Sequence, residues 1–511
     1  MHPSVHAAAR PDHPAIIMAG SGEVMTYAEL DARSNQYAQL FRKLGLQPQD
    51  HIAIFLENCI DFMPLVWAAQ RTGLVYTPIS THLLNEEVAY ILQNSGARLL
   101  VTSDYMKGVA KEVRESTESL EFAYMLRAQI PGFESLEDAI ADLSTGPVDD
   151  EEGGTQMLYS SGTTGLPKGV LVARPPGSPI TEHSKVALAL VSNFGIGPES
   201  VYLSPAPLYH AAPLAFNTIS MALGGTSVVM ERFDPEKALE AIERYAVTHS
   251  QWVPIMFVRM LKLPESVRNQ FDLSTQKIAI HAAAPCPVEV KRQMIEWWGP
   301  RLFEYYASTE GAGFTAIDSA NWLAHPGSVG QPVGCEVKIL DDSGEELPSG
   351  AVGGVYFSAN DQPFQYYKEP EKTAGSFTSD GWATVGDVGY VDDDGFLFLT
   401  DRKHYMIITG GVNVYPQEIE NALITHAEVA DAAVFGLPDA EFGERVHAVV
   451  QPAKGVSGDD ALKQRLTEYL RERMSHIKIP RSIDFDPALP RHDNGKLYKR
   501  RLLERYQQAA T

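Results

Sequence analysis

The segment with the most informative side chains runs from Tyr159 to Gly169 and reads Tyr-Ser-Ser-Gly-Thr-Thr-Gly-Leu-Pro-Lys-Gly. Its glycines let backbone N–H groups approach an anion closely, and its hydroxyls and the Lys168 ammonium are further donors. This set of donors suits a polyphosphate. Pro167 stands directly before Lys168, where a Walker A loop needs glycine, so that loop type is excluded. Composition alone leaves a Gly/Ser-rich surface loop as the alternative.

Four further segments carry polar side chains that a nucleotide site could use: Tyr305–Gly311, Gly381–Asp387, Asp401–His404 and Asn494–Lys496. Glu310 is a natural ligand for Mg²⁺, which takes one or two carboxylates together with phosphate oxygens. Asp387 can accept both hydroxyls of a ribose. Singly, each has an ordinary explanation: a helix cap for Glu310, a turn for Asp387 and a solvated charge for Lys496. Their joint order along the chain favours a nucleotide site.

Apolar runs separated by polar segments predict a layered fold. In the first third, strands are expected at His51–Leu56, Val75–Ile79 and Ala97–Ser103, and helices at Phe62–Thr72 and Glu86–Asn94. Such alternation is typical of a parallel sheet with covering helices. The acidic, Gly-rich stretch 146–154 predicts a linker, after which a strand at Gln156–Tyr159 leads into the Gly/Ser loop.

The later part of the chain predicts a β-rich region and a small C-terminal α+β unit. Asp234 and Pro235 predict a helix start, and Leu239, Ile242 and Ala246 would share one face of that helix. Strands are expected at Leu302–Tyr305, Val337–Leu340, Gly354–Ser358, Phe396–Leu399, Val429–Phe435 and Val446–Gln451, and helices at Gln417–Ile424 and Leu462–Met474. We predict an N-terminal domain over 1–402 and a C-terminal domain over 403–511.

Composition narrows the class of protein. With 511 residues the chain is long enough for two to four domains. Its net charge of −23 argues against nucleic acid or an anionic membrane surface as a partner. Residues 1–10 lack the apolar core of a signal peptide, and no stretch predicts a membrane-spanning helix, so a cytoplasmic location is expected. Cys59, Cys286 and Cys335 are far apart and support neither disulfides nor a zinc site.

In their order, these motifs resemble those of the adenylate-forming superfamily: acyl-CoA synthetases, peptide-synthetase adenylation domains and luciferases. The resemblance extends from about Thr26 to about Arg501 and is carried above all by Ser160–Gly169 and Asp401–Glu420. It implies an α/β protein with a large N-terminal domain of parallel-type sheets, covering helices and a β-rich subdomain. It also implies a small mobile C-terminal domain that rotates between two half-reactions. The chain departs from the family at the hinge residue, His404, which is usually Asp or Lys.

The resemblance assigns roles to the motif residues. Lys496 would bridge the substrate carboxylate and the α-phosphate, where a cation lowers the barrier to the meeting of two anions. Thr309 would contact the α-phosphate, Glu310 would hold Mg²⁺, and His210 would lie beside the acyl pocket and the route of the thiol. The residues implied to bind ATP or CoA are Ser160, Ser161, Gly162, Thr163, Thr164, Gly165 and Lys168 at the β- and γ-phosphates, Ala283, Ala284, Pro285, Tyr306 and Ala307 at the adenine, Asp387 and Arg402 at the ribose, and Gly410 and Gly411 in the pantetheine tunnel. Ala307 is a second departure, because the family often has glycine there.

The expected acid is apolar. The segments expected around its pocket, His210–Met221, Trp252–Met260 and His281–Ala284, carry little charge, whereas an amino acid's ammonium would need a buried carboxylate. A weaker resemblance, in 281–287 and 489–496, is to bacterial ligases for long-chain or steroid side-chain acids. We therefore expect an acid–CoA ligase that yields acyl-CoA, AMP and pyrophosphate. An amide-bond synthetase and a catalytically silent nucleotide-binding scaffold stay as alternatives, and the sequence leaves a homodimer open.

Overall fold

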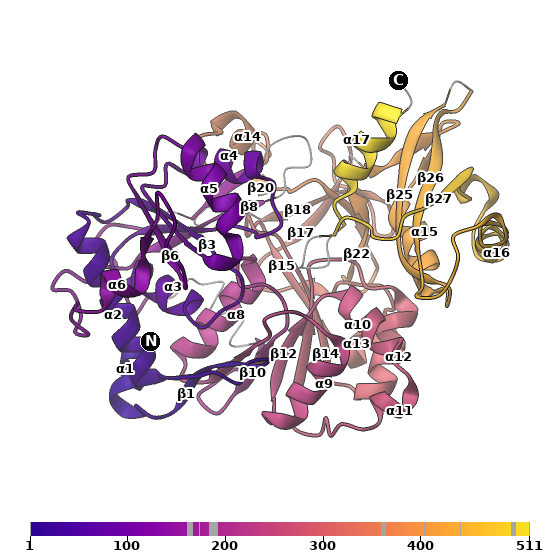
Figure 1. Cartoon of the computed structure of the whole chain (residues 1–511). Coiled ribbons are helices and arrows are strands. Elements are labelled where there is room, and N and C mark those ends of the chain that lie inside the picture. Colours follow the sequence, from indigo (N-terminus) through magenta and orange to yellow (C-terminus); the bar gives the residue numbers. More distant parts are fainter. Residues whose placement is uncertain are drawn as a thin grey trace.

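The computed structural model describes residues 2–160, 167–172, 174–182, 193–358, 364–402, 405–439, 441–491 and 497–509. These residues form four sheets, with helices between and around them (Figure 1). The predicted α/β class is confirmed: a larger N-terminal part contains three of the sheets, and a smaller C-terminal part, orange to yellow in Figure 1, contains the fourth. Within the described residues, no helix combines the length and apolarity needed to cross a bilayer.

The eight-stranded sheet carries the Gly/Ser loop near one edge. In spatial order its strands are β19 (Gln365–Tyr366), β9 (Lys168–Leu171), β8 (Thr155–Ser160), β4 (Val75–Pro78), β3 (His51–Phe55), β5 (Leu99–Ser103), β6 (Phe122–Leu126) and β7 (Glu134–Ser135). Pairing is parallel from β8 to β7 and antiparallel between β8, β9 and β19. The helices of this part are α1 (Pro3–Ala9), α2 (Tyr27–Lys43), α3 (Phe62–Arg71), α4 (Asn85–Ser95), α5 (Lys107–Ser116) and α6 (Leu136–Ile140).

The nine-stranded sheet is also parallel in its centre and antiparallel at its edges. In spatial order its strands are β16 (Gln331–Pro332), β15 (Phe314–Asp318), β14 (Leu302–Ala307), β13 (Ile278–His281), β12 (His249–Trp252), β10 (Val201–Ser204), β11 (Thr226–Val229), β1 (Pro14–Met18) and β2 (Val24–Thr26). Its helices are α8 (Ala211–Ala222), α9 (Pro235–Arg244), α10 (Pro254–Leu261), α11 (Glu265–Arg268), α12 (Val288–Trp298) and α13 (Ser319–Ala324).

Burial divides both large sheets into two faces, because successive residues of a strand point to opposite sides. In β3, Ile54 packs with α2, α3 and α8, whereas Phe55 packs with α4 and α5. In β10, Tyr202 packs against α8, whereas Leu203 packs with α9, α10 and α12. Helices α2, α3 and α8 therefore form a layer between the two sheets, whereas α4 and α5 cover the outer face of one sheet and α9, α10 and α12 that of the other (Figure 1).

The third sheet of the N-terminal part is small and antiparallel, and it directly precedes the C-terminal part in the sequence. It consists of β17 (Val337–Leu340), β18 (Gly353–Ser358), β20 (Trp382–Ala383), β21 (Asp387–Val391) and β22 (Leu397–Arg402), with α14 (Pro370–Ala374) before β20. The C-terminal part contains β23 (Ile407–Thr409), β24 (Val412–Val414), α15 (Pro416–Thr425), β25 (Val429–Asp439), β26 (Gly443–Pro452), α16 (Asp460–Arg471), β27 (Ser482–Phe485) and α17 (Lys499–Ala509). Its core holds the apolar faces of α15 and α16 against β25 and β26.

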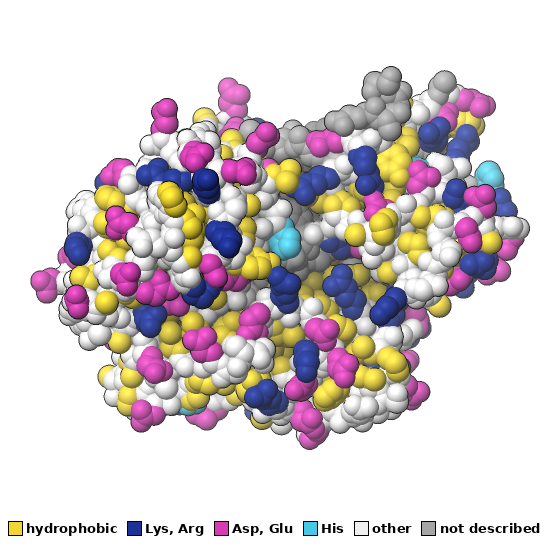
Figure 2. Space-filling view, viewed as in Figure 1, with side chains coloured by type: hydrophobic (Ala, Val, Ile, Leu, Met, Phe, Trp, Pro, Cys, Tyr) yellow, Lys and Arg dark blue, Asp and Glu magenta, His cyan; other side chains and the backbone are white. Residues whose placement is uncertain are grey.

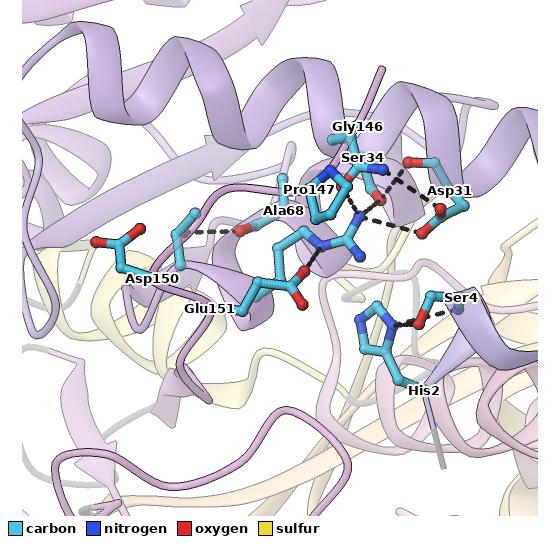
Figure 3. Close-up of polar contacts among 12 residues, drawn as sticks. His2, Ser4, Asp31, Ser34, Ala68, Gly146, Pro147, Asp150 and Glu151 are labelled. Atoms are coloured by element: carbon cyan, nitrogen blue, oxygen red, sulfur yellow. Dashed lines mark hydrogen bonds and ion pairs between the residues drawn. The ribbon is translucent and has the colours of Figure 1, made fainter. Parts of the chain in front are cut away.

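The predicted linker 146–154 is fastened to the helices beside it. Arg71, at the end of α3, has a side chain only 1% exposed and donates to Glu151 Oε1 at 2.8 Å. The same guanidinium donates to Ser34 Oγ at 2.9 Å and lies 3.1 Å from Asp31 Oδ1, both on α2 (Figure 3). A buried guanidinium needs such partners for its N–H groups. The linker is thus fixed to α2 and α3 just before β8 begins.

One predicted core position is wrong. Helix α9 begins after its Asp234 cap as expected but ends at Arg244, and Ala246 is exposed with φ +50°. The N–H of Val247 donates to Ile242 O at 3.0 Å, and Val247 is fully buried. This is the left-handed helix ending usually made by glycine. The burial of Val247 outweighs the free-energy cost of a left-handed backbone at Ala246. The sequence has no glycine here that would have predicted the end of the helix.

Candidate active site

The predicted adenine segment and the Tyr306 motif lie at the ends of two neighbouring strands. Strands β13 and β14 are parallel and adjacent, with His281 opposite Glu304. The segments that follow them, 282–285 and 308–310, therefore emerge at the same carboxyl edge of the nine-stranded sheet, next to Tyr306 near the end of β14. In open α/β sheets, this edge is where ligands bind.

The backbone of the adenine segment has an unusual conformation at Ala283. Its φ of +73° lies in the left-handed region, where an L side chain costs about 1–2 kcal/mol and glycine costs nothing. Ala283 and Pro285 are exposed and Ala284 is half-buried, so the segment is available to a ligand. This segment has alanines where the family is richer in glycine. The backbone of Ala283 nevertheless adopts the left-handed conformation that glycine favours.

A buried ion pair lies beneath the Tyr306 motif. Lys291 of α12 places its Nζ 2.5 Å from Glu304 Oε2, and His281 Nε2 lies 3.6 Å from the same oxygen. Burial lowers the pKa of His281, and the Lys291 ammonium lowers it further, so the imidazole is neutral. Burial raises the pKa of Glu304, and Lys291 opposes this effect. This pair was not predictable from the sequence, because a Lys on a helix and a Glu on a strand are ordinary surface residues.

The structure joins two of the predicted nucleotide residues directly. The hydroxyl of Tyr306 donates to the carboxylate of Asp387, which is buried. Asp387 opens β21 and lies opposite Arg402 in the register with β22. The aromatic ring expected at the adenine is thus hydrogen-bonded to the carboxylate expected at the ribose, and the backbone of Arg402 lies opposite that carboxylate's residue. The side chain of Arg402 lies outside the described part of the structure.

A second connected group joins the Gly/Ser loop to the turn after β14. Ser160 and Lys168 face each other at the ends of β8 and β9, so they form the base of the loop. Lys168 Nζ lies 4.8 Å from the ring centroid of Tyr366, and the Tyr366 hydroxyl donates to Glu310 Oε1 at 3.0 Å. Sequence reasoning missed Tyr366. Only the pairing of β19 with β9 brings it to Glu310.

The turn that holds Thr309 and Glu310 is suited to an oxygen-rich ligand. Gly311 closes it with φ +68°, and its N–H donates to Ser308 O at 3.0 Å. Among the described residues, the buried Oγ of Ser308 has no hydrogen-bond partner, an arrangement that costs free energy unless a ligand or water supplies one. Glu310 is a single carboxylate, which fits Mg²⁺ bound together with phosphates rather than an all-protein metal cage.

His210 stands at the N-terminal end of α8, on a loop that Asn58 fixes. The buried Asn58 amide donates to Ala206 O at 3.2 Å and Met230 O at 2.8 Å, and its oxygen accepts from Leu208 N at 2.8 Å. The His210 ring packs 4.5 Å from that of its neighbour Tyr209.

The segments expected around the acyl pocket divide between two faces of the sheet. Phe216 of α8 packs with Ala282 and Tyr305, whereas Trp252–Met260 and His281 pack on the side of α12.

The remaining predicted residues fall in two places. Gly410 and Gly411 form the two-residue turn between β23 and β24, with φ of +56° and +77°, as a type I′ hairpin requires. The predictions for Ser161, Gly162, Thr163, Thr164, Gly165, Lys496 and the hinge residue His404 lie outside the described residues. Figure 2 shows Lys and Arg side chains on both sides of the junction between the N-terminal and C-terminal parts, despite the net negative charge. Asp and Glu side chains lie among them, so this face carries both signs of charge.

Comparisons with known proteins agree with this geometry. The profile of the family described as AMP-binding enzyme matches residues 4–367, and that of the AMP-binding enzyme C-terminal domain matches residues 418–496. The fatty acid–[acyl-carrier-protein] ligase ScoC of Streptomyces coeruleorubidus is 31% identical over 510 residues, which cover 98% of this chain and 95% of ScoC.

Two solved structures extend the comparison to the fold. The o-succinylbenzoate CoA synthetase MenE from Bacillus subtilis, in complex with the acyl-adenylate intermediate, matches with a TM-score of 0.82 and 27% identity over 98% of this chain and 97% of that one. The amide bond synthetase McbA from Marinactinospora thermotolerans matches with a TM-score of 0.80 and 28% identity over 96% and 97%. The chain therefore belongs to the AMP-binding enzyme family, the adenylate-forming superfamily, and is of the acyl-CoA synthetase type.

Proposed function

We propose that this chain activates an apolar carboxylic acid with ATP and then transfers the acyl group to CoA. The observation that carries the proposal is the convergence of Lys168, Tyr366 and Glu310 on the turn beside the linked pair Tyr306 and Asp387. A cation, a metal-type carboxylate and a ribose-type carboxylate, contributed by three different sheets, suit the phosphates, the metal and the sugar of ATP.

In the first step, a carboxylate oxygen of the acid attacks the α-phosphorus of ATP, and the bond from that phosphorus to the bridging oxygen of pyrophosphate breaks. Lys168 and the loop that it closes would hold the departing phosphates. Glu310 would hold Mg²⁺, which neutralises charge on the leaving group when bound. Lys496 would stand between the two anions, and the turn residues Ser308 and Thr309 would donate to the α-phosphate. Holding both reactants removes much of the entropic barrier.

In the second step, the CoA thiol gives its proton to solvent, its sulfur adds to the acyl carbonyl carbon, and AMP leaves with the electrons of the broken bond between the acyl carbon and the phosphate oxygen. His210, at the N-terminal end of α8, would position the acyl group for this step. Among the described residues of 194–307, Glu304 is the buried carboxylate, and it is already paired with Lys291 on the other side of the sheet. The α8 side thus offers no counter-ion to an ammonium, which supports an apolar acid over an amino acid.

The experiment that tests the proposal is an acid panel incubated with ATP, Mg²⁺ and CoA, with products identified by mass spectrometry. Straight-chain, aromatic and steroid side-chain acids should be included, together with amino acids as a contrast. We expect a CoA thioester, AMP and pyrophosphate from at least one apolar acid. AMP formation with amino acids alone would contradict the proposed acid class.

The role of Lys496 is tested by separating the two half-reactions. Lys496→Ala should abolish acid-dependent ATP–pyrophosphate exchange, because the cation is needed while the two anions meet. Thioester formation from supplied acyl-adenylate and CoA should stay close to wild type. An equal loss of both reactions would contradict this assignment.

An amide-bond synthetase is the second candidate, and the likeness to McbA supports it. Both candidates share the adenylate and differ in the acceptor. The same panel with an amine in place of CoA decides between them: an amide product with no thioester would favour the second candidate.

A further inference from the structure

The short segment that carries Lys496 is closed at its base and anchored in the C-terminal part. Arg491 and Leu497 pair as an antiparallel bridge, and Tyr498 N donates to Pro490 O at 2.8 Å. The Arg491 guanidinium binds the buried carboxylate of Asp431, with Nη2 to Oδ1 at 2.5 Å. Just after the bridge, Lys499 pairs with Glu420 at 2.8 Å, and both side chains are less than a tenth exposed. The base of the segment therefore moves with the C-terminal core.

One contact ties the same base to the N-terminal part. The Tyr498 hydroxyl donates to Glu87 Oε1 at 2.7 Å, and Arg501 Nη2 donates to Glu87 Oε2 at 2.9 Å. Glu87 lies in the first turn of α4, where Oε2 also accepts from Leu84 N at 2.8 Å. The helix is firmly seated, because Val88 and its apolar neighbours are buried against β3 and β5. Both oxygens of one carboxylate are thus used to join two parts of the chain.

We propose that Glu87 is a positioning residue for adenylation, which holds the C-terminal part in the arrangement where Lys496 serves the ATP site. This inference rests on the proposed function. Tyr498 follows Lys496 by two residues, so restraining Tyr498 restrains the point at which the lysine is presented. A contact that spans the two parts stabilises only the arrangement in which both sides meet. Glu87 should therefore favour the first half-reaction and contribute nothing to the second.

The size of the effect follows from the bonds. The carboxylate side chain of Glu87 is 18% exposed and that of Arg501 is 35% exposed, so solvent screens the pair only in part. A hydrogen bond to a charged group is stronger than a neutral one by an amount that changes an equilibrium constant about tenfold. Here the equilibrium is between the arrangement with the Glu87 contact and arrangements without it. Replacing the carboxylate by an amide should reduce the adenylation rate roughly tenfold.

The test compares Glu87→Gln with Glu86→Gln, a matched control on the exposed side of the same helical turn. Glutamine keeps the length of the side chain and an oxygen that can accept from Leu84. With dodecanoate and 3-phenylpropanoate as acid probes, kcat for ATP–pyrophosphate exchange should fall about tenfold in Glu87→Gln, with KM for ATP within about twofold. Thioester formation from supplied dodecanoyl-adenylate should be unchanged. Glu86→Gln should match wild type in both assays.

Two further variants separate positioning from folding. Tyr498→Phe should reproduce part of the loss, and the charge swap Glu87→Arg with Arg501→Glu should restore exchange above either single variant. Equal loss of both half-reactions in Glu87→Gln, or wild-type exchange in both Glu87→Gln and Tyr498→Phe, would overturn the proposal.

A distance measurement keeps this inference distinct from the proposed function. Spin labels at Lys111 and Glu504, both exposed, report the distance from the α4–α5 layer to α17 without acid or ATP. The distribution should broaden in Glu87→Gln and stay narrow in Glu86→Gln; an unchanged distribution would overturn the contact's role. Absence of exchange from the wild-type protein with every acid would instead overturn the proposed function.

Discussion

Replacing Lys291 by methionine removes the ammonium of the buried pair beneath the Tyr306 motif and keeps an unbranched apolar stem. The Lys291 side chain is 0% exposed and that of Glu304 is 6% exposed, so the carboxylate would stay buried without its charge partner. Breaking a buried pair from one side costs about 3–5 kcal/mol. For a cooperative unit of roughly 400 residues, the unfolding entropy near 60 °C is about 0.8 kcal/mol/K, so the melting midpoint should fall by about 4–6 °C.

The loss should grow with pH. Burial raises the pKa of Glu304 from its ordinary 4.5, and removing Lys291 removes the group that opposes this rise. A carboxyl whose pKa is higher in the folded state binds its proton more tightly there. The free energy of unfolding therefore falls as pH rises from the unfolded pKa to the folded one and then levels off. Lys291→Met should lie closest to wild type at about pH 4.5 and furthest from it at about pH 8.

Scanning calorimetry at several pH values measures both effects. The double variant Lys291→Met/Glu304→Leu removes both charges and should recover most of the lost midpoint, because a buried pair replaced by apolar residues is often neutral. Lys237→Met is the matched control, since its partner Glu240 and Lys237 itself are exposed; its midpoint should move by less than about 1 °C. A single variant as stable as wild type at high pH, or a double variant no better than the single one, would refute the reasoning.

Three further changes are predicted. Ala283→Gly should stabilise the protein by about 1 kcal/mol, because φ is +73° there; a lower melting midpoint would show that this backbone is not strained. Tyr306→Phe removes the hydroxyl that donates to Asp387 and should raise KM for ATP about tenfold in steady-state assays with kcat near wild type, whereas a pure kcat loss would point to a role in the chemical step. Gly154→Ala should lower the melting midpoint by more than any exposed Gly→Ala change, because its Cβ would lie 2.4 Å from Ala69 O; unchanged melting would contradict this packing.

Local elements of the fold could be predicted because burial leaves a continuous apolar signal. The strand expected at His51–Leu56 is observed at His51–Phe55, and the helix expected at Gln417–Ile424 is observed as Pro416–Thr425. A parallel strand buried on both faces is apolar throughout, so its limits are visible in one sequence. The strand order was not predictable. Strand β1 pairs with β11 through Ile16 and Ser227, and only tertiary packing selects partners that far apart.

The candidate site was predictable as a set of residues but not as a set of contacts. The motifs that contain Tyr306, Asp387 and Glu310 were visible because of their joint order along the chain, although each side chain alone has an ordinary explanation. Tyr366 was not, since it stands in an ordinary aromatic run and reaches Glu310 only through the pairing of β19 with β9. Glu87 was hidden for the same reason, because an acid in the first turn of a helix is common.

The ion pair between Arg71 and Glu151 has a consequence for the Gly/Ser loop, because it fixes the linker that precedes the loop's first strand. The linker is held against α2 and α3 by this contact, and β8 begins directly after it. The strands at the base of the Gly/Ser loop are therefore anchored to the core of the N-terminal part. The rotation of the C-terminal part that the proposed function requires would therefore leave these strands in place. Under the proposed mechanism, the phosphates of ATP would bind beside these strands, and Lys496 and the CoA thiol would reach the acyl group in turn as the C-terminal part changes position.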